Sequence, residues 1–534
     1  MNKKIITLLI ATATLCCGCF DSSNILGKYT TWGGPLSLSS KAFEKYDLTY
    51  DMTKINGLLD NYIAAIKAED LSKVKSYRAL VNYEACLLDD KCMFANIKWY
   101  AHPNDQTKAI YDDLNSKFNS YYVRYVEACE EANKTGNKQI IDTVVGSKAK
   151  LPKDAAKEVE LSNKMLEFNE KGEALDNDRA SYTQEAFFKK GLEMFVEYAE
   201  ICDEYAELFD YNDEYSNYLD YSYKEVYNRK YSPVDCSNLT TLVKNVVAPK
   251  YQQFDISSLN PFVQERIYSA RSTSFAAKSL DLGKKLDEYA ECLGGSYQDI
   301  YTKCFTSGYF IFSNDEKSMS TAVTADLNFN SNGGILYFSK NYQDYSTILH
   351  EFGHYYSFRM NDLTMSKSYD LNETFSQGNE MLFSAYLLNN YTGDFYQGIA
   401  KQTVDSFYKS LMTICYTVDI ENYLFNNYKT KSIDEMYQYI ISLYNEYNVP
   451  AIYADYWVYP ILVSTGYYIS YATSIIESLQ IFTLARENFS NAYKAYSDLI
   501  SQQEILGEVE AWEKAGLSSP FKESTITEIV KYYA

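Results

Sequence analysis

Hydrophobic residues recur every three or four positions through much of the first half of the chain. From position 46 to about 227 they form successive stripes, such as the one made by Ile55, Leu58, Leu59, Tyr62, Ile63 and Ile66. This spacing is typical of amphipathic helices that bury one face. Residues that break helices or form turns interrupt the pattern at 102–104, 134–137 and 231–233, where we expect helices to end.

The pattern changes between Phe305 and Phe338. Short runs of β-branched and aromatic residues occupy 309–312, 322–324 and 335–338, with turn-forming residues between them. These runs predict a small sheet. Two roles for it stay open, because an exposed edge could hold an extended peptide by main-chain hydrogen bonds or the strands could be purely structural.

Helical spacing returns at 346–358 and again at 371–388. In the second stretch, one helix face carries Glu373, Gln377, Glu380 and Ser384. These polar residues could form a solvated face, but the positions between them are largely apolar, which favours burial. The chain is therefore predicted to be mainly α, with a small sheet just before the helix at 346–358.

The composition agrees with a folded, mostly helical protein. The 534 residues are 46% hydrophobic and 16% aromatic, with only 9 Pro and 22 Gly, which argues against disorder and against a turn-rich all-β fold. A chain of this length can form two or three subdomains. The net charge of −21 argues against nucleic acid as a partner, because a polyanion would be repelled.

The N-terminus has the pattern of an export signal. Two lysines precede an apolar run at 5–15, which is too short to span a bilayer but suits a secretion signal. The following Leu15-Cys-Cys-Gly-Cys19 resembles a bacterial lipobox, and Cys19, preceded by Gly18, is the predicted lipidation site. We therefore expect a signal peptide and lipobox at 1–19, a spacer at 20–45, and a protein held by a lipid on the extracytoplasmic face of a bacterial membrane. An unlipidated secreted protein or an uncleaved anchor is the alternative.

Eight further cysteines follow, an even number that is compatible with disulfides outside the cytoplasm. Cys86 and Cys92 are close enough in sequence to pair locally. Free buried thiols remain the alternative for the others, and the sequence does not give the connectivity.

The strongest chemical signal is His350-Glu-Phe-Gly-His354. Residues four apart share a helix face, so His350 and His354 can offer two ring nitrogens to one metal ion, with Glu351 placed to take a proton from water. This H-E-x-x-H pattern is a zinc hydrolase signature, and it uses two of the only 3 histidines in the chain. The third, His102, lies beside a proline and is expected in a surface loop.

A catalytic zinc ion usually takes three protein ligands and leaves a fourth position for water. Glu373, 23 residues beyond His350, is the predicted third ligand, since that interval allows a loop and an antiparallel return. Glu380 is predicted to orient a ligand histidine through its other ring nitrogen. One Zn²⁺ per chain is the expected cofactor. No additional histidine follows at the metzincin spacing, which disfavours that branch of the zincins.

Taken together, these motifs resemble the oligoendopeptidase F and thimet oligopeptidase family of zinc peptidases. The resemblance rests on the His350 to His354 motif, the Glu373 and Glu380 pair, and the stretches 335–338 and 467–473. A weaker similarity lies at 227–249. Overall the resemblance extends from about residue 200 to 500.

The resemblance implies a zincin-type helical peptidase with a deep channel between subdomains that admits peptides and excludes folded proteins. It also implies a tyrosine that stabilises the oxyanion, for which Tyr467, Tyr468 and Tyr471 are the candidates by position. Three features depart from the family pattern. Ser357 stands where an extra histidine is usual, the loop before Glu373 is short, and no histidine precedes the tyrosine segment, where 457–460 reads Trp-Val-Tyr-Pro.

These observations predict a helical N-terminal region at 46–290 and a zinc peptidase region at 291–534. We expect a zinc-dependent endopeptidase of short peptides, in which Glu351 takes a proton from the attacking water and passes it to the leaving amine. Two alternatives remain: a catalytically inactive, peptide-binding lipoprotein with a metallopeptidase fold, or another zincin with a glutamate ligand and a different specificity.

Overall fold

The computed structural model describes residues 47–145, 151–209, 215–272, 281–307, 310–313, 315–319, 321–327, 334–339, 342–360, 368–447, 454–502 and 507–532. Most of these residues are helical and three strands form one sheet, which confirms the predicted mainly α fold with a small sheet. The predicted signal peptide, the lipidation site Cys19 and the spacer lie outside the described residues. Among the described helices, none is both long and apolar enough to cross a bilayer.

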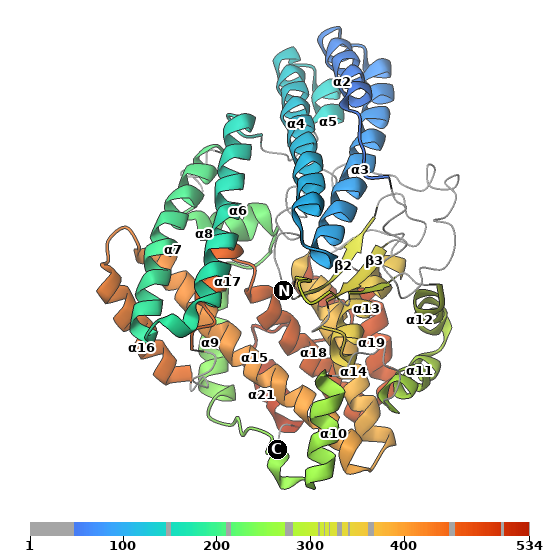
Figure 1. Ribbon diagram of the computed structural model, residues 1–534, viewed down its shortest axis with the longest axis vertical. Helices are drawn as coiled ribbons and strands as arrows, with labels where there is room; N and C mark the ends of the chain where they lie inside the picture. Colours follow the sequence, from blue (N-terminus) through green and yellow to red (C-terminus); the bar gives the residue numbers. More distant parts are fainter. Residues whose placement is uncertain are drawn as a thin grey trace.

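The N-terminal helices form an elongated bundle, blue and cyan at the top of Figure 1. It consists of α2 (Met52–Lys67), α3 (Leu71–Ala101), α4 (Asp105–Thr135) and α5 (Lys138–Val144). The predicted breaks at 102–104 and 134–137 separate α3 from α4 and α4 from α5. Asn104 caps α4 by accepting hydrogen bonds from the backbone of Gln106 and Thr107, and Gly136 ends it with a φ of 66°.

The sheet has the strand order β1-β3-β2. Its strands are β1 (Phe310–Phe312), β2 (Ala322–Asp326) and β3 (Gly334–Phe338), close to the predicted runs. Strand β3 pairs in parallel with β1 and antiparallel with β2, so β2 is an edge strand.

Both faces of the sheet are buried, which explains the uninterrupted hydrophobic run in β3. Ile335 and Tyr337 pack into the core of the N-terminal bundle, whereas Leu336 and Phe338 pack into the core of the remaining helices. The end of α3 is also bonded to the sheet region, because the carbonyl of Tyr100 accepts from the Tyr337 hydroxyl at 3.1 Å. The sheet therefore joins the two cores.

The remaining helices form the larger, lower part of the molecule in Figure 1. In chain order they are α6 (Ala155–Asn177), α7 (Gln184–Glu207), α8 (Tyr218–Tyr221), α9 (Pro233–Leu242), α10 (Pro261–Ser272), α11 (Asp281–Leu293), α12 (Gly295–Ser307), α13 (Tyr345–Met360), α14 (Tyr369–Asn390), α15 (Asp394–Asn427), α16 (Ile433–Tyr447), α17 (Val458–Val463), α18 (Ile469–Glu487), α19 (Phe489–Ser501), α20 (Glu508–Lys514) and α21 (Glu523–Ile529). Helices α13 and α14 lie below the sheet, and α6, α7 and α16 lie at the left of Figure 1. Short 3-10 or π turns are η4 (Arg179–Ser181), η6 (Ser222–Val226), η7 (Val243–Val247), η8 (Ile256–Ser258) and η11 (Val530–Tyr532).

Helix α14 is the central element of this assembly. It packs against α13 on one side and α18 on another, and every residue from Asp370 to Leu387 is buried. The face with Glu373, Gln377, Glu380 and Ser384 is therefore part of the interior, as the apolar intervening positions predict.

The cysteines within the described ranges form no disulfides, and all except Cys292 are buried. Cys86 and Cys92 both lie on α3, six residues apart, and no disulfide joins them. The local disulfide that their spacing allows is therefore not formed.

Candidate metal centre

The two motif histidines lie on one face of α13. Asp344 starts this helix by accepting backbone hydrogen bonds from Ser346 at 3.0 Å and Thr347 at 3.2 Å. One turn further on, the rings of His350 and His354 have centroids 5.1 Å apart. The four-residue spacing thus directs both rings to the same side of the helix.

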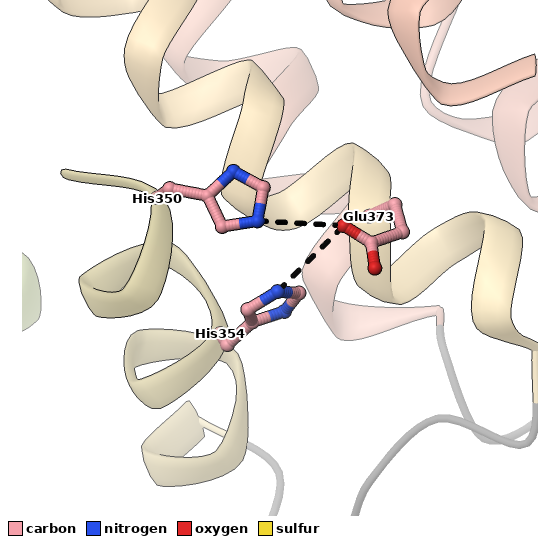
Figure 2. Close-up of side chains that lie close together, drawn as sticks. All are labelled: His350, His354 and Glu373. Atoms are coloured by element: carbon pink, nitrogen blue, oxygen red, sulfur yellow. Dashed lines mark ion pairs between the residues drawn. The ribbon is translucent and has the colours of Figure 1, made fainter. Parts of the chain in front are cut away.

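Glu373 reaches the histidines from α14, as Figure 2 shows. Its Oε2 lies 3.5 Å from His350 Nε2 and 3.8 Å from His354 Nε2. The three ligand atoms all fall within 4.8 Å of one another, and Glu373 is buried. Two imidazole nitrogens and one carboxylate oxygen form a donor set that suits a catalytic zinc ion.

A glycine in the motif permits this approach of the two helices. A Cβ atom added at Gly353 would lie 2.5 Å from the backbone oxygen of Phe375 and 2.7 Å from the Cα of Ser376. Any larger residue would therefore push α13 away from α14, and Glu373 away from the histidines.

Each histidine has a second partner that fixes its ring. His350 Nδ1 lies 2.9 Å from Oε1 of Glu380, and the hydroxyl of Ser346 donates to the other oxygen of Glu380. The ring of His354 hydrogen-bonds to the backbone of Asn372. Such contacts set the tautomer and orientation of a metal-binding histidine, and Glu380 is in the place predicted for it.

The electrostatics of the group favour a bound cation. Burial opposes ionisation of Glu373, but the hydrogen bond from His350 and the nearby histidine charges lower the pKa of Glu373 to about 2. Burial lowers the pKa of His354 to about 4. Burial also disfavours charge on His350, yet Glu373 and Glu380 raise the pKa of His350 well above its ordinary value. The carboxylates of Glu373 and Glu380 thus stabilise the positive charge of protonated His350. A bound metal ion could take the place of that proton and supply the positive charge instead.

Glu351 lies beside the group on α13 and is held by strand β2. The hydroxyl of Thr324 donates to Oε2 of Glu351 at 2.8 Å. Burial raises the pKa of Glu351 to about 7, a value that suits a group that both takes and gives a proton near neutral pH. Thr324 was not identified from the sequence, where nothing distinguishes it from other strand threonines.

A cavity of about 320 Å³ opens next to these residues. Its walls come from β2, from the segment before α13, and from α13 and α14. The lining residues are Ala322, Tyr342, Asp344, Ser346, Thr347, His350, Glu351 and Glu380. The proposed proton carrier and one of the histidines therefore border the same space.

The three candidate tyrosines have different surroundings. The hydroxyl of Tyr467 donates to Oε1 of Glu373 at 2.6 Å. Tyr468 is hydrogen-bonded to Tyr456. Tyr471 lies with its ring 5.3 Å from that of Tyr467, and besides burial the charges of Glu373 and Glu351 raise the pKa of its hydroxyl.

The positions that depart from the family pattern do not add a ligand. Ser357 is buried and its hydroxyl donates to the backbone oxygen of His354 at 2.8 Å. Trp457 is buried against Phe188. His102 lies between α3 and α4 with Nδ1 3.3 Å from Asp315, and it is not part of the metal-binding group within the described ranges.

Comparisons with known proteins relate this chain to solved structures. No protein-family model matches the sequence, and no curated protein matches it significantly. In structure, the chain is similar to PZ peptidase A with a bound inhibitor, at 13% identity and a TM-score of 0.64, over 91% of this chain and 97% of that one.

Two oligoendopeptidase structures give the same result. A protein of Bacillus anthracis str. Ames described as an oligoendopeptidase F has 15% identity and a TM-score of 0.64, over 93% of this chain and 97% of that one. Oligoendopeptidase F of Enterococcus faecium has 13% identity and a TM-score of 0.50, over 89% and 95%. The chain therefore has the oligoendopeptidase F fold over most of its length, which confirms the predicted resemblance at the level of the fold.

Proposed function

We propose that this chain is a zinc-dependent endopeptidase that hydrolyses short peptides. The observation that carries the proposal is the placement of Glu351 on the cavity wall beside His350, with His354 and Glu373 completing a three-residue metal-binding group. The structural neighbours, which are named as peptidases, support the same reaction class.

His350, His354 and Glu373 are the residues that would hold the metal. Zinc bound there would lower the pKa of a water molecule and polarise the peptide carbonyl. Glu351 takes the proton of the attacking water and delivers it to the leaving amine, while Thr324 keeps its carboxylate turned to the cavity. Tyr471 is the tyrosine we assign to the oxyanion, because the hydroxyl of Tyr467 is bonded to Glu373.

The sheet offers a way to hold the substrate. Within the described residues, strand β2 is paired with β3 on one side only, and it carries Thr324, the partner of Glu351. A peptide in extended conformation beside β2 would bond to its main chain and pass in front of Glu351. Main-chain recognition of this kind needs no particular substrate sequence.

We further propose that the reaction takes place outside the cytoplasm, on the surface of a bacterial membrane. The support comes from the N-terminal sequence, in which the apolar run at 5–15 precedes the lipobox-like segment ending at Cys19. Peptides outside the cell, rather than products of cytoplasmic degradation, would then be the substrates.

The decisive substitution is Glu351→Gln. It removes the proton carrier and leaves the three metal-binding side chains in place, so we expect zinc content to be kept and kcat to fall by about 100- to 10,000-fold. A suitable control is Glu158→Gln, since Glu158 is also a buried glutamate, bonded to Tyr122 and to Tyr205 at 3.1 Å, but lies on α6 outside the site.

The assay measures cleavage of a mixture of short peptides by mass spectrometry, together with the zinc content of the same samples. Internal cuts in peptides and none in intact folded proteins are expected for the parent and for the control. Unchanged activity in Glu351→Gln would contradict the assignment of Glu351. Zinc binding without any cleavage by the parent would instead indicate a peptide-binding protein, and removal of single terminal residues would indicate a zincin of another specificity.

A further inference from the structure

A buried ion pair lies near the start of α14, the helix that carries Glu373. Arg229 and Asp370 are 3% and 1% exposed, and Arg229 Nε is 3.3 Å from Asp370 Oδ1. Taking two charges out of water is costly unless their remaining hydrogen bonds are satisfied. The surroundings of this pair supply those bonds from three separate parts of the chain.

Arg229 connects the segment after η6 to the stretch that precedes and begins α18. Its guanidinium donates to the backbone oxygen of Gly466 and, at 2.6 Å, to the hydroxyl of Ser470. The rings of Tyr223 and Tyr227 lie 4.6 and 4.4 Å from the guanidinium carbon. The planar guanidinium therefore has fixed contacts at its edge and on its faces.

Asp370 connects the same stretch to the first turn of α14. It accepts hydrogen bonds from the hydroxyls of Tyr231 and Ser470, and from Thr473 at 3.0 Å. Its own backbone oxygen accepts from Thr374 at 2.8 Å. The start of α14 is thus tied to the start of α18 through one carboxylate.

The contacts of Arg229 reach Gly466, and the next residue in the chain, Tyr467, contacts the predicted metal ligand Glu373. Gly466, whose carbonyl accepts from Arg229, directly precedes Tyr467, and the hydroxyl of Tyr467 donates to Glu373 at 2.6 Å. Gly466 itself has a φ of 76°, and an added Cβ would lie 2.6 Å from Ser222 Oγ. Its N–H donates to Glu421 at 2.8 Å. The two peptide groups that flank the Cα of Gly466, directly before Tyr467, are therefore both held by hydrogen bonds.

From this arrangement we infer that Arg229, held by Asp370, is a positioning residue that places the Tyr467 hydroxyl against Glu373 and so tunes metal affinity. The inference rests on the proposed function only in taking Glu373 as a metal ligand. Arg229 reaches neither the cavity nor the histidines, and acts through the Gly466 carbonyl and the Tyr467 hydroxyl.

The test measures Zn²⁺ affinity by competition with a chromogenic chelator. Arg229→Lys keeps the charge but loses the fork that reaches Gly466 and Ser470 together, and should weaken Zn²⁺ binding by about 10-fold, as expected for partners of metal ligands. Ser470→Ala removes the buried hydroxyl that accepts from Arg229 and donates to Asp370, and should weaken Zn²⁺ binding in the same direction by less. Asp405→Asn is the matched control, because Asp405 is buried, paired with Lys409 at 2.8 Å, and bonded to Tyr251 and Phe254 rather than to the site.

A double-mutant cycle separates positioning from general stability. If Arg229 acts through Tyr467, then Arg229→Lys should change Zn²⁺ affinity by less than about 2-fold in a Tyr467→Phe background, because the affected contact is already gone. Equal effects of Arg229→Lys in both backgrounds would overturn the inference. A second outcome would also overturn the inference. In it, Arg229→Lys and Ser470→Ala bind Zn²⁺ as tightly as the parent protein, and only their melting temperatures fall, as in Asp405→Asn.

Because the readout is Zn²⁺ affinity, failure of this inference can be distinguished from failure of the proposed peptidase function. A parent protein that binds Zn²⁺ but cleaves no peptide would overturn the proposed peptidase function. The role of Arg229 would still be decided by the affinities of the variants.

Discussion

Tyr467 and Tyr471 lie four residues apart around the start of α18, yet they meet different parts of the candidate metal centre. Tyr467 donates to Glu373 at 2.6 Å, whereas Tyr471 is partly buried beside the charges of Glu373 and Glu351. A hydroxyl on a metal-binding carboxylate affects metal affinity, and a hydroxyl beside the reacting carbonyl affects turnover. The two tyrosines should therefore be separable by experiment.

We expect Tyr467→Phe to weaken Zn²⁺ binding, and about 10-fold is reasonable for a residue in contact with a metal ligand. Tyr471→Phe should leave zinc content unchanged and lower kcat by about 100-fold, the loss typical of one oxyanion donor. Zn²⁺ titration and steady-state kinetics at saturating zinc measure the two effects. Tyr468→Phe is the control, since Tyr468 pairs with Tyr456, and a large loss of kcat in it would contradict the assignment of Tyr471.

A second prediction at this scale concerns Glu477, which is fully buried on α18. One of its oxygens accepts from Gln480 at 2.7 Å, and the other has no hydrogen-bond partner among the described residues. Burial raises the pKa of Glu477 well above its ordinary value. Because the folded state then holds the proton more tightly than the unfolded state, stability from this group is present at low pH and is lost as pH rises.

Glu477→Gln should therefore raise the melting temperature at pH 8, and the gain should vanish towards pH 4.5, the ordinary range of a glutamate pKa. Thermal unfolding of both proteins across this pH range gives the answer. Glu435→Gln serves as a contrast, because Glu435 is exposed and hydrogen bonds from Ser432 and Lys431 lower its pKa to about 2. No gain at pH 8 is expected in the contrast variant, and a pH-independent gain for Glu477→Gln would refute the explanation.

At the scale of elements, the crossing of α13 and α14 determines whether the three metal-binding side chains meet. The crossing is close because Gly353 has no side chain to meet the backbone at Phe375 and Ser376. The sheet contributes on the other side of α13, where Thr324 of β2 holds Glu351. The candidate metal centre is thus built from two helices and a strand in direct contact.

Gly353→Ala should destabilise the protein by about 1–3 kcal/mol through overpacking, and should lower Zn²⁺ affinity because the helices must separate. Chemical denaturation and Zn²⁺ titration measure the two effects. Gly57→Ala on α2 is a sharp control, because an added Cβ there meets nothing within 4 Å. In that helix alanine should stabilise by about 0.5–1 kcal/mol. Similar stability changes in the two variants would argue against a close helix approach at Gly353.

At the scale of the whole molecule, one sheet connects two hydrophobic cores. The N-terminal bundle packs on one face of the sheet and the helices around α13 on the other. A movement of the bundle would therefore shift the sheet, including β2, whose Thr324 contacts Glu351. The net charge of −21 would repel the molecule from anionic surfaces, so the membrane location that we propose would depend on a lipid at Cys19.

That location gives a further prediction. When the full chain is made in a bacterium, Cys19→Ser should move it from the membrane fraction to the soluble fraction or stop its processing, because the acceptor of the lipid is lost. Cys17→Ser should leave the distribution unchanged. Fractionation followed by mass spectrometry of the mature N-terminus tests both variants. A parent protein found only in the soluble fraction would contradict lipid attachment.

Much of the fold and part of the site follow from local patterns. The helix breaks at 102–104 and 134–137, the strands, and the helices that carry His350 and Glu373 match their predicted positions, whereas near 231–233 the preceding helical turn already ends at Val226 and a new helix begins at Pro233. The spacing of His350 and His354, and of Glu373 and Glu380, places each pair on one helix face wherever that helix lies. Periodicity of this kind is a property of neighbouring residues, so the sequence alone determines it.

The tertiary structure decided everything that depends on residues far apart in the chain. Arg229 and Asp370 are 141 residues apart, and Thr324 meets Glu351 across a strand and a helix. No periodicity shows that Tyr467 faces Glu373 while Tyr468 faces Tyr456. Such contacts exist only because packing fixes the distance between elements, and at Gly353 that distance depends on the absence of a single methyl group.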